Sequence, residues 1–328
     1  MTALAPVLQG FFADRLTQRG VSPHTVLSYR DTWRLLLGFA RDRTGTAPCA
    51  LDLGQLDAEL VGAFLDHLES VRHNSARTRN LRLTAVHSFY SYAALRCPEH
   101  AATIQRVLAI PAKRPDSRLV TYLTRPEADA LLAAPDRSTR LGRRDHLLLA
   151  VAVATGLRVS ELTGLTTADV SVGAGAHVRC HGKGRKDRIV PLSRSVARLL
   201  CDWLDELRPA PTGLLFPTRD GGRLSSDAVA DLLAKHLIVA SRSYPTLAAK
   251  NVTPHTLRHT NAMDMLQAGV DTTVIALWLG HASTRSTQPY LHADLTIKEA
   301  ALARTAPHPA ARQRYKPTDS LLDFLESL

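Results

Sequence analysis

The side chains best suited to chemistry are concentrated in residues 253–290, which read TPHTLRHTNAMDMLQAGVDTTVIALWLGHASTRSTQPY. His255 and Arg258 stand three positions apart, so they share one face of the helix that this stretch predicts. His281 follows the expected end of a second helix, and Tyr290 comes nine positions later. Histidine, arginine and tyrosine side chains near helix ends are suited to holding a phosphate group. The stretch therefore predicts a phosphate site.

Arginine side chains at two places could hold a phosphodiester during cleavage. Arg158, in TGLRVSEL, and Arg258 both present planar, paired donors, which can bind the non-bridging oxygens while phosphorus becomes five-coordinate. His255 and His281 can donate or accept protons near neutral pH, to or from the same oxygens or a nucleophile. These four residues predict a site that cleaves a phosphodiester without a metal.

A lysine and a tyrosine could supply the remaining steps. Lys183 lies in a glycine-flanked turn, from which its ammonium group could protonate a leaving oxygen. Tyr290 is the candidate nucleophile, because nearby cations would favour its phenolate during attack. Glu161, three positions after Arg158, is predicted to orient that arginine. His259 fits equally well a role in helix packing and a supporting role beside the phosphate.

Five motifs occur in order along the second half of the chain. They are TGLRVSEL (155–162), GKGRKDR (182–188), HTLRH (255–259), LGH (279–281) and Tyr290. In order and in spacing, this set resembles the motif set of the tyrosine recombinase, or phage integrase, family. The resemblance assigns catalytic roles to six residues, which are Arg158, Lys183, His255, Arg258, His281 and Tyr290.

The resemblance also implies an activity and partners. The expected enzyme is a site-specific DNA recombinase that cuts and rejoins strands through a 3′-phosphotyrosine intermediate, leaves a free 5′-hydroxyl and needs no metal or ATP. The expected partners are double-stranded DNA recombination sites and further protomers, in a homo- or hetero-tetramer that exchanges C-terminal segments, here residues 321–328. The residues after Tyr290 look more like integrases of mobile elements, so the expected role is to integrate, excise or transpose such an element.

Hydrophobic periodicity predicts a mainly α-helical fold with a small antiparallel β-sheet. Residues 1–110 read as helices throughout, and the resemblance makes them a SAM-like core-binding domain. Residues 111–122 form a basic linker that contains two prolines. Residues 123–305 combine helices with a hairpin at 168–192 into an α+β catalytic domain, and 306–328 form a tail with a short amphipathic helix. The resemblance implies that the two domains form a C-shaped clamp on DNA.

Short polar residues and glycine predict several helix boundaries. Ser22 and Thr253 each precede a proline, which suits the first position of a helix, and Thr124 begins a capping box. A buried helix is predicted over 146–155, and it ends at Gly156, which can adopt the left-handed conformation of a helix cap.

Basic residues cluster between Val71 and Pro115, where eight lysines and arginines accompany a single acid, Glu99. So few compensating acids favour a helix presented to a polyanion over a merely solvated charged face. Together with two residues of the hairpin, the predicted DNA-contacting residues are Arg72, Arg77, Arg79, Arg82, Lys113, Arg114, Lys186 and Arg188.

The composition agrees with a nucleic-acid partner without requiring one. The 328 residues carry a net charge of +11, and the pI is about 9.9. The four cysteines are scattered and form no CxxC pair, which is typical of a reduced, cytoplasmic protein. No signal peptide is expected, and the longest apolar run, 147–154, is too short to cross a bilayer.

Three other functions remain open on the sequence. A metal-dependent nuclease could also use several histidines, but the carboxylates near the motifs have no ligand-like spacing. A catalytically silent DNA-binding relative would not need the full motif set with Tyr290. A type IB topoisomerase would use the same chemistry to relax DNA, although the helical N-terminal region and the short chain resemble a recombinase more.

Overall fold

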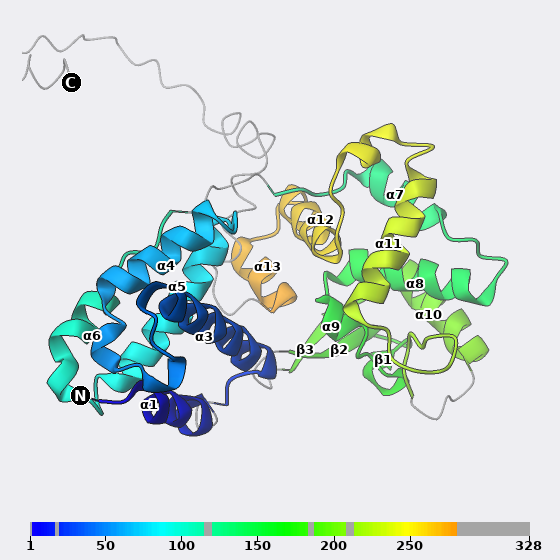
Figure 1. Ribbon diagram of the computed structural model, residues 1–328. Coiled ribbons are helices and arrows are strands. Elements are labelled where there is room, and N and C mark those ends of the chain that lie inside the picture. Colours follow the sequence, from blue (N-terminus) through cyan, green and yellow to red (C-terminus); the bar gives the residue numbers. More distant parts are fainter. Residues whose placement is uncertain (1, 17–19, 115–119, 183–186, 208–212, 281–328) are drawn as a thin grey trace, which may run out of the picture. The chain divides into compact units, whose positions relative to one another are not determined.

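The chain divides into two compact units, Met1–Arg118 and Leu119–Leu328, each with its own hydrophobic core. The computed structural model (Figure 1) describes residues 2–16, 20–114, 120–182, 187–207 and 213–280. The division falls within the predicted linker 111–122, but the end of that linker belongs to the second unit. There, Val120 and Tyr122 pack against a buried cluster that includes Met263 and Ile275.

The N-terminal unit is built from helices whose first residues are set by polar caps. The side chains of Ser22, Asp57 and Ser75 accept hydrogen bonds from backbone N–H groups in the first turn of the helices that follow them. The predicted helix start after Ser22 is therefore confirmed. The elements are α1 (Leu4–Gly10), a π-helical segment (Phe11–Arg15), α3 (Pro23–Thr44), α4 (Ala58–Ser70), α5 (Ala76–Ala93) and α6 (Ala101–Leu108).

Aromatic side chains connect separate elements in the core of this unit, which is otherwise rich in leucine. The rings of Trp33 on α3 and Phe89 on α5 meet edge to face, with centroids 4.5 Å apart. Tyr90 is fully buried, and its hydroxyl donates a hydrogen bond to the carbonyl oxygen of Leu56. These contacts join helices that are distant in sequence into a single unit.

The second unit confirms the predicted fold class, mainly α-helical with a small antiparallel sheet. Its elements are α7 (Arg125–Ala133), α8 (Arg140–Thr155), α9 (Val159–Leu162), β1 (Val170–Ser171), β2 (His177–His181), β3 (Asp187–Pro191), α10 (Arg194–Leu207), α11 (Ser226–Ala240), α12 (Pro254–Gln267) and α13 (Thr272–Leu279). Helix α8 begins six residues before the predicted start at 146, because the Thr139 hydroxyl accepts from the N–H of Gly142 and caps the helix there. No helix in the described ranges is long and apolar enough to cross a bilayer.

The three strands form an antiparallel sheet in the order β1–β2–β3. Val178 is paired with Val190, and Cys180 is paired with Arg188. Val178, Cys180 and Val190 are buried, so this face of the sheet is turned toward the core. Arg188 therefore extends from the inward face of β3, although it is charged.

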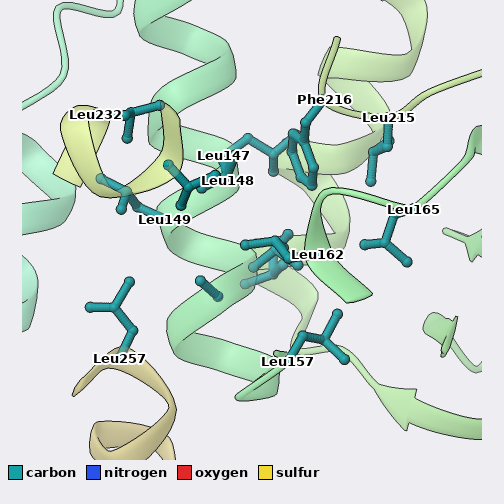
Figure 2. Close-up of a cluster of buried hydrophobic side chains, with 14 of the residues drawn as sticks. Leu147, Leu148, Leu149, Leu157, Leu162, Leu165, Leu215, Phe216, Leu232 and Leu257 are labelled. Atoms are coloured by element: carbon teal, nitrogen blue, oxygen red, sulfur yellow. The ribbon is translucent and has the colours of Figure 1, made fainter. Parts of the chain in front are cut away.

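Helix α8 lies at the centre of the second core and packs against α7, α10 and α12. Three consecutive leucines on α8, 147–149, are buried (Figure 2). The side chains around them come from α9, the segment before α11, α11 itself and α12, and they include Leu162, Phe216, Leu232 and Leu257. Because α9 follows α8 directly and α12 packs on α8, the motifs that carry Arg158 and Arg258 are brought together.

Candidate active site

The turn between α8 and α9 allows three helices to approach one another closely. Gly156 ends α8 with a φ of 62°, and Arg158 then becomes the N-cap residue of α9. A Cβ atom on Gly156 would lie 2.6 Å from Leu279 Cδ2 and 2.8 Å from Asn261 Oδ1. Glycine is thus required both for the backbone conformation and for the contact of this turn with α12 and α13.

Replacing Gly156 with alanine is expected to destabilise the second unit. The left-handed conformation costs a residue with a Cβ about 1–2 kcal/mol, and the overpacking against Leu279 and Asn261 adds about 1–3 kcal/mol. Gly175→Ala is the matched control, because Gly175 has a φ of 73° but no atom within 4 Å of its added Cβ. Urea unfolding should therefore show a clearly larger loss for Gly156→Ala. Equal losses in the two variants would contradict the packing explanation.

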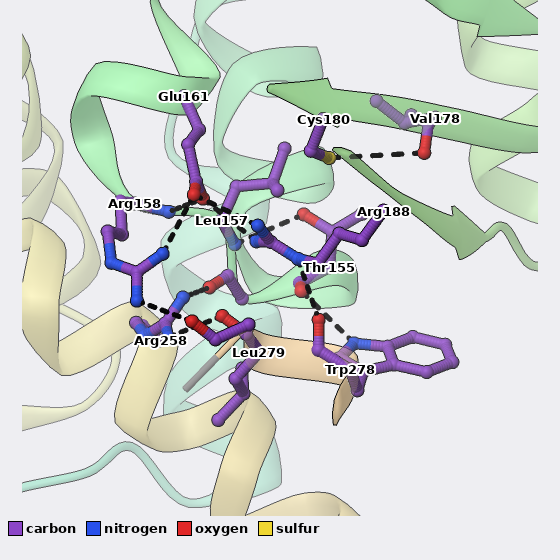
Figure 3. A network of polar contacts seen from close by, with 12 residues as sticks. Thr155, Leu157, Arg158, Glu161, Val178, Cys180, Arg188, Arg258, Trp278 and Leu279 are labelled. Atoms are coloured by element: carbon purple, nitrogen blue, oxygen red, sulfur yellow. Dashed lines mark hydrogen bonds and ion pairs between the residues drawn. The ribbon is translucent and has the colours of Figure 1, made fainter. Parts of the chain in front are cut away.

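The Glu161 carboxylate is buried and is shared by two arginines (Figure 3). Arg158 donates from its backbone N–H at 2.9 Å and from Nη1 at 2.8 Å, and Arg188 donates from Nη1 and Nη2 at 2.9 and 2.8 Å. Burial by itself would raise the pKa of Glu161, but the hydrogen bonds from Arg188 and from the Arg158 backbone outweigh it and hold the pKa at about 2. The predicted contact between Glu161 and Arg158 is present, and the carboxylate is ionised at neutral pH.

Three arginines hold the carboxyl end of α13. The carbonyl oxygens of residues 278, 279 and 280 accept from Arg188 Nε at 3.0 Å, Arg258 Nη2 at 2.6 Å and Arg158 Nη2 at 2.8 Å. Arg258 is buried and also donates to the carbonyl of Gly156 at 2.7 Å. The last carbonyls of a helix have no partner within it and carry partial negative charge, so cations stabilise them. We call Arg158, Arg188 and Arg258 the arginine cluster. The end of α13, which leads directly to residue 281, is thereby fixed on this cluster.

A pocket of about 370 Å³ lies beside Arg158, where α11 and α12 begin. Arg158 and His255 line it together with Ser226 of α11 and Pro254 of α12. Helix amino ends carry partial positive charge and free backbone N–H groups. Two helix amino ends, a half-exposed arginine and a histidine around one cavity favour an anion such as a phosphate.

The two histidines of α12 are both electrically neutral at neutral pH. Their rings are stacked, with centroids 5.9 Å apart. Burial, with smaller contributions from Arg258 and Arg158, lowers the pKa of His255. Burial also lowers the pKa of His259 to about 4, with further contributions from His255 and Arg258. A neutral imidazole can accept a proton, which suits His255 to proton transfer at the pocket.

We expect the free energy of unfolding to fall in mild acid because of His259. The unfolded chain takes up this proton near the usual pKa of 6.5, but the folded chain does so only near a pKa of about 4. Stability should therefore rise with pH between these two values and level off above 6.5. His259→Gln should flatten this part of the profile in urea unfolding at a series of pH values. An unchanged slope in His259→Gln would contradict the assignment.

The structure brings part of the predicted site together. Arg158, Glu161, His255, Arg258 and His259 lie around the arginine cluster and its pocket. Four further predicted site residues, Lys183, Lys186, His281 and Tyr290, lie outside the described residues.

Arg188, a predicted DNA contact, has partners within the protein. Its side chain is 13% exposed, and its guanidinium donates to Glu161 and to the carbonyl of Trp278. The sequence does hold a signal for this placement. Arg188 stands two positions from Val190, so strand alternation places both on the inward face of β3.

Two predicted DNA contacts on α5, Arg79 and Arg82, also bind groups of the protein itself. Arg79 is buried, and it donates to the carbonyl of Pro111 at 3.2 Å. Arg82 donates to the hydroxyl of Thr32 on α3 at 3.0 Å. Both stand at helical spacing from buried residues such as Val86, which places them toward the core side of the helix. Among the other predicted DNA contacts, those that are exposed are Arg72, Arg77, Lys113 and Arg114.

Both units match known protein families. Residues 121–296 match the phage integrase family, and residues 8–96 match the N-terminal SAM-like domain of phage integrases. A protein of Sinorhizobium fredii (strain NBRC 101917 / NGR234) named as an integrase/recombinase, y4rC, is 56% identical over 327 residues, which cover 99% of this chain and 98% of that protein. The tyrosine recombinase XerC of Pelobacter propionicus is 34% identical over 296 residues, which cover 89% of this chain and 93% of that protein.

Solved structures of recombinases share the fold. The integrase of transposon Tn1549 in complex with transposon right end DNA has a TM-score of 0.68 at 18% identity, over 94% of this chain and 100% of that chain. The XerH site-specific recombinase bound to a difH substrate has a TM-score of 0.65 at 23% identity, over 83% of this chain and 78% of that chain. Since two family matches cover most of the sequence and a relative of 56% identity spans nearly all of it, the chain belongs to the phage integrase family of tyrosine recombinases.

Proposed function

We propose that this chain cuts and rejoins DNA strands at specific sites through a 3′-phosphotyrosine intermediate formed by Tyr290. The observation that carries the proposal is that Arg158 and Arg258 both bind the end of α13. Arg158 also lines a pocket together with His255 and the amino ends of α11 and α12. Positive charge in that place would stabilise the additional negative charge of a five-coordinate phosphorus. We call Arg158 and Arg258 the arginine pair.

The proposed reaction is a transesterification. The Tyr290 oxygen attacks phosphorus, and the bond from phosphorus to the 5′ oxygen breaks as the tyrosine–phosphorus bond forms. Lys183 donates a proton to the leaving 5′ oxygen, and His255 and His281 exchange protons with the phosphate oxygens or the nucleophile. A 5′-hydroxyl from another strand then reverses the step. Because the phosphodiester energy is kept in the covalent bond, no ATP is consumed, and the arginine pair takes the place of a metal ion.

The proposed partners are two DNA recombination sites and three further protomers. Exposed basic residues at 72, 77, 113 and 114 would contact the phosphate backbone, and Lys186 would do so from the hairpin. Residues 321–328 would dock on a neighbouring protomer. Deleting 318–328 should then reduce the size of the DNA-bound assembly and strand exchange, and an unchanged assembly would contradict this docking.

The proposed biological role is the integration, excision or transposition of a mobile element in the cytoplasm. The fold shared with the Tn1549 transposon integrase supports this role, as does the 56% identity to a protein named as an integrase/recombinase. Recombination between two sites should accompany any relaxation of supercoils. Relaxation without exchange would favour a topoisomerase instead.

The decisive experiment is a suicide substrate, a candidate site from the flanking DNA with a nick beside the scissile bond. The wild-type chain should become covalently attached in excess chelator, because the arginine pair carries the charge stabilisation. Digestion and mass spectrometry should place the DNA on the peptide that contains Tyr290, joined to a 3′ phosphate. Attachment through a 5′ phosphate, or loss of attachment in chelator, would overturn the mechanism.

A further inference from the structure

Arg188 holds a position that the proposed chemistry does not yet use. Its side chain is 13% exposed, and all three nitrogens of its guanidinium donate hydrogen bonds to the Glu161 carboxylate and the carbonyl of Trp278. In Figure 3 it lies on the side of the carboxylate opposite Arg158. It thereby joins β3, α9 and α13, three elements that are distant in sequence.

The charge of this arrangement matters as much as its geometry. Glu161 alone would largely neutralise Arg158, because an ion pair in a buried place is screened little by water. A second arginine on the same carboxylate leaves the group of Arg158, Glu161 and Arg188 with one net positive charge. The Arg158 guanidinium can therefore attract a phosphate while its orientation is still fixed by Glu161.

Arg188 also supports the end of α13 by direct packing. A Cβ atom on Gly280 would lie 2.8 Å from Arg188 Nη1, so the guanidinium rests against the backbone there. Arg158 donates to the carbonyl of that same residue. Arg188 thus holds both partners of the Arg158 guanidinium in place, the Glu161 carboxylate and the carbonyl of Gly280.

We infer that Arg188 is a positioning residue for strand cleavage, which sets the orientation and the free positive charge of Arg158 through Glu161 and the end of α13. This inference rests on the proposed function, in which Arg158 holds the scissile phosphate. Arg188 itself acts through these partners and not by contact with DNA.

Two variants separate the charge of Arg188 from its geometry. Arg188→Met removes the charge and all the donors, whereas Arg188→Lys keeps a charge that cannot pair with both carboxylate oxygens. Arg179→Met is the matched control, because Arg179 lies on β2 of the same sheet and its side chain is 52% exposed. Each protein is tested on two suicide substrates, one with a normal scissile phosphodiester and one with a neutral methylphosphonate, which has less need of a cation.

On the normal substrate we expect single-turnover cleavage by Arg188→Met to be roughly 100-fold slower than wild type. On the methylphosphonate that defect should shrink by about tenfold or more. The variant has lost stabilisation of the negative charge on the non-bridging oxygens, and the methylphosphonate carries less of that charge. Arg188→Lys should show an intermediate defect with the same dependence on substrate, and Arg179→Met should cleave like wild type.

A defect of equal size on both substrates would overturn the inference, because a general loss of structure does not depend on the charge of the phosphate. Wild-type rates in Arg188→Met would overturn it as well. If Arg188→Met does not fold, Arg188→Lys provides the test. The inference fails if Arg188→Lys cleaves the normal substrate at the wild-type rate, or if its cleavage rate falls by the same factor on both substrates. A wild-type chain that forms no adduct at Tyr290 would instead contradict the proposed function.

Discussion

Replacing Tyr290 with phenylalanine is expected to abolish the covalent protein–DNA adduct and to leave noncovalent DNA binding near the wild-type level. The substitution removes the attacking oxygen and keeps the ring, so packing should change little. Loss of a nucleophile slows hydrolases by roughly 10⁴-fold or more, and adduct formation should fall below detection on that scale. The arginine pair and the basic surface are untouched, so electrophoretic mobility shift should still show binding.

Tyr315→Phe provides the matched control for Tyr290→Phe. Tyr315 also lies in the C-terminal part of the chain, and its substitution removes the same oxygen. The Tyr315 variant should form the adduct at the wild-type rate. If the adduct persisted in Tyr290→Phe and disappeared in Tyr315→Phe, the nucleophile would have to be reassigned.

Replacing Arg258 with methionine should cost both stability and cleavage. Arg258 is buried and donates to the carbonyls of Gly156 and Leu279 at 2.7 and 2.6 Å. The variant leaves both carbonyls without these donors, and each unsatisfied buried acceptor costs about 1–3 kcal/mol. Removal of a buried cation offsets part of that loss. We expect the free energy of unfolding to fall by about 2–4 kcal/mol and cleavage by the folded variant to fall by about 10²–10³-fold.

Two measurements separate these effects. Urea unfolding reports the stability loss, and single-turnover cleavage on a suicide substrate, at a temperature where the variant is folded, reports the loss of charge stabilisation. Arg140→Met is the control for stability, because Arg140 on α8 is exposed and its side chain pairs with Glu206 only at 3.9 Å. Such surface pairs contribute about 0–1 kcal/mol. If Arg258→Met were as stable as Arg140→Met, Arg258 would not anchor the two carbonyls.

Helix boundaries were predictable from the sequence because they depend on neighbouring residues. Ser22 and Thr253 accept hydrogen bonds from N–H groups three residues later, so each helix start is encoded within four positions. Gly156 ends α8 for an equally local reason, its left-handed backbone. The hairpin and the fold class follow from the change of periodicity along the chain. The start of α8 was missed because its cap, Thr139, precedes the buried stretch that reveals the helix.

The sequence by itself determined which residue types the site contains, their order, and the helices that carry them. Only the tertiary structure decided where the charged groups point. Arg158, Arg188 and Arg258 meet the end of α13 through hydrogen bonds between residues 122, 90 and 21 positions apart. The excess of basic over acidic residues cannot tell Arg188, whose side chain is 13% exposed and pairs with Glu161, from Arg72, which is exposed. That distinction depends on which buried carboxylates and carbonyls lie within reach, and the packing of distant elements sets it.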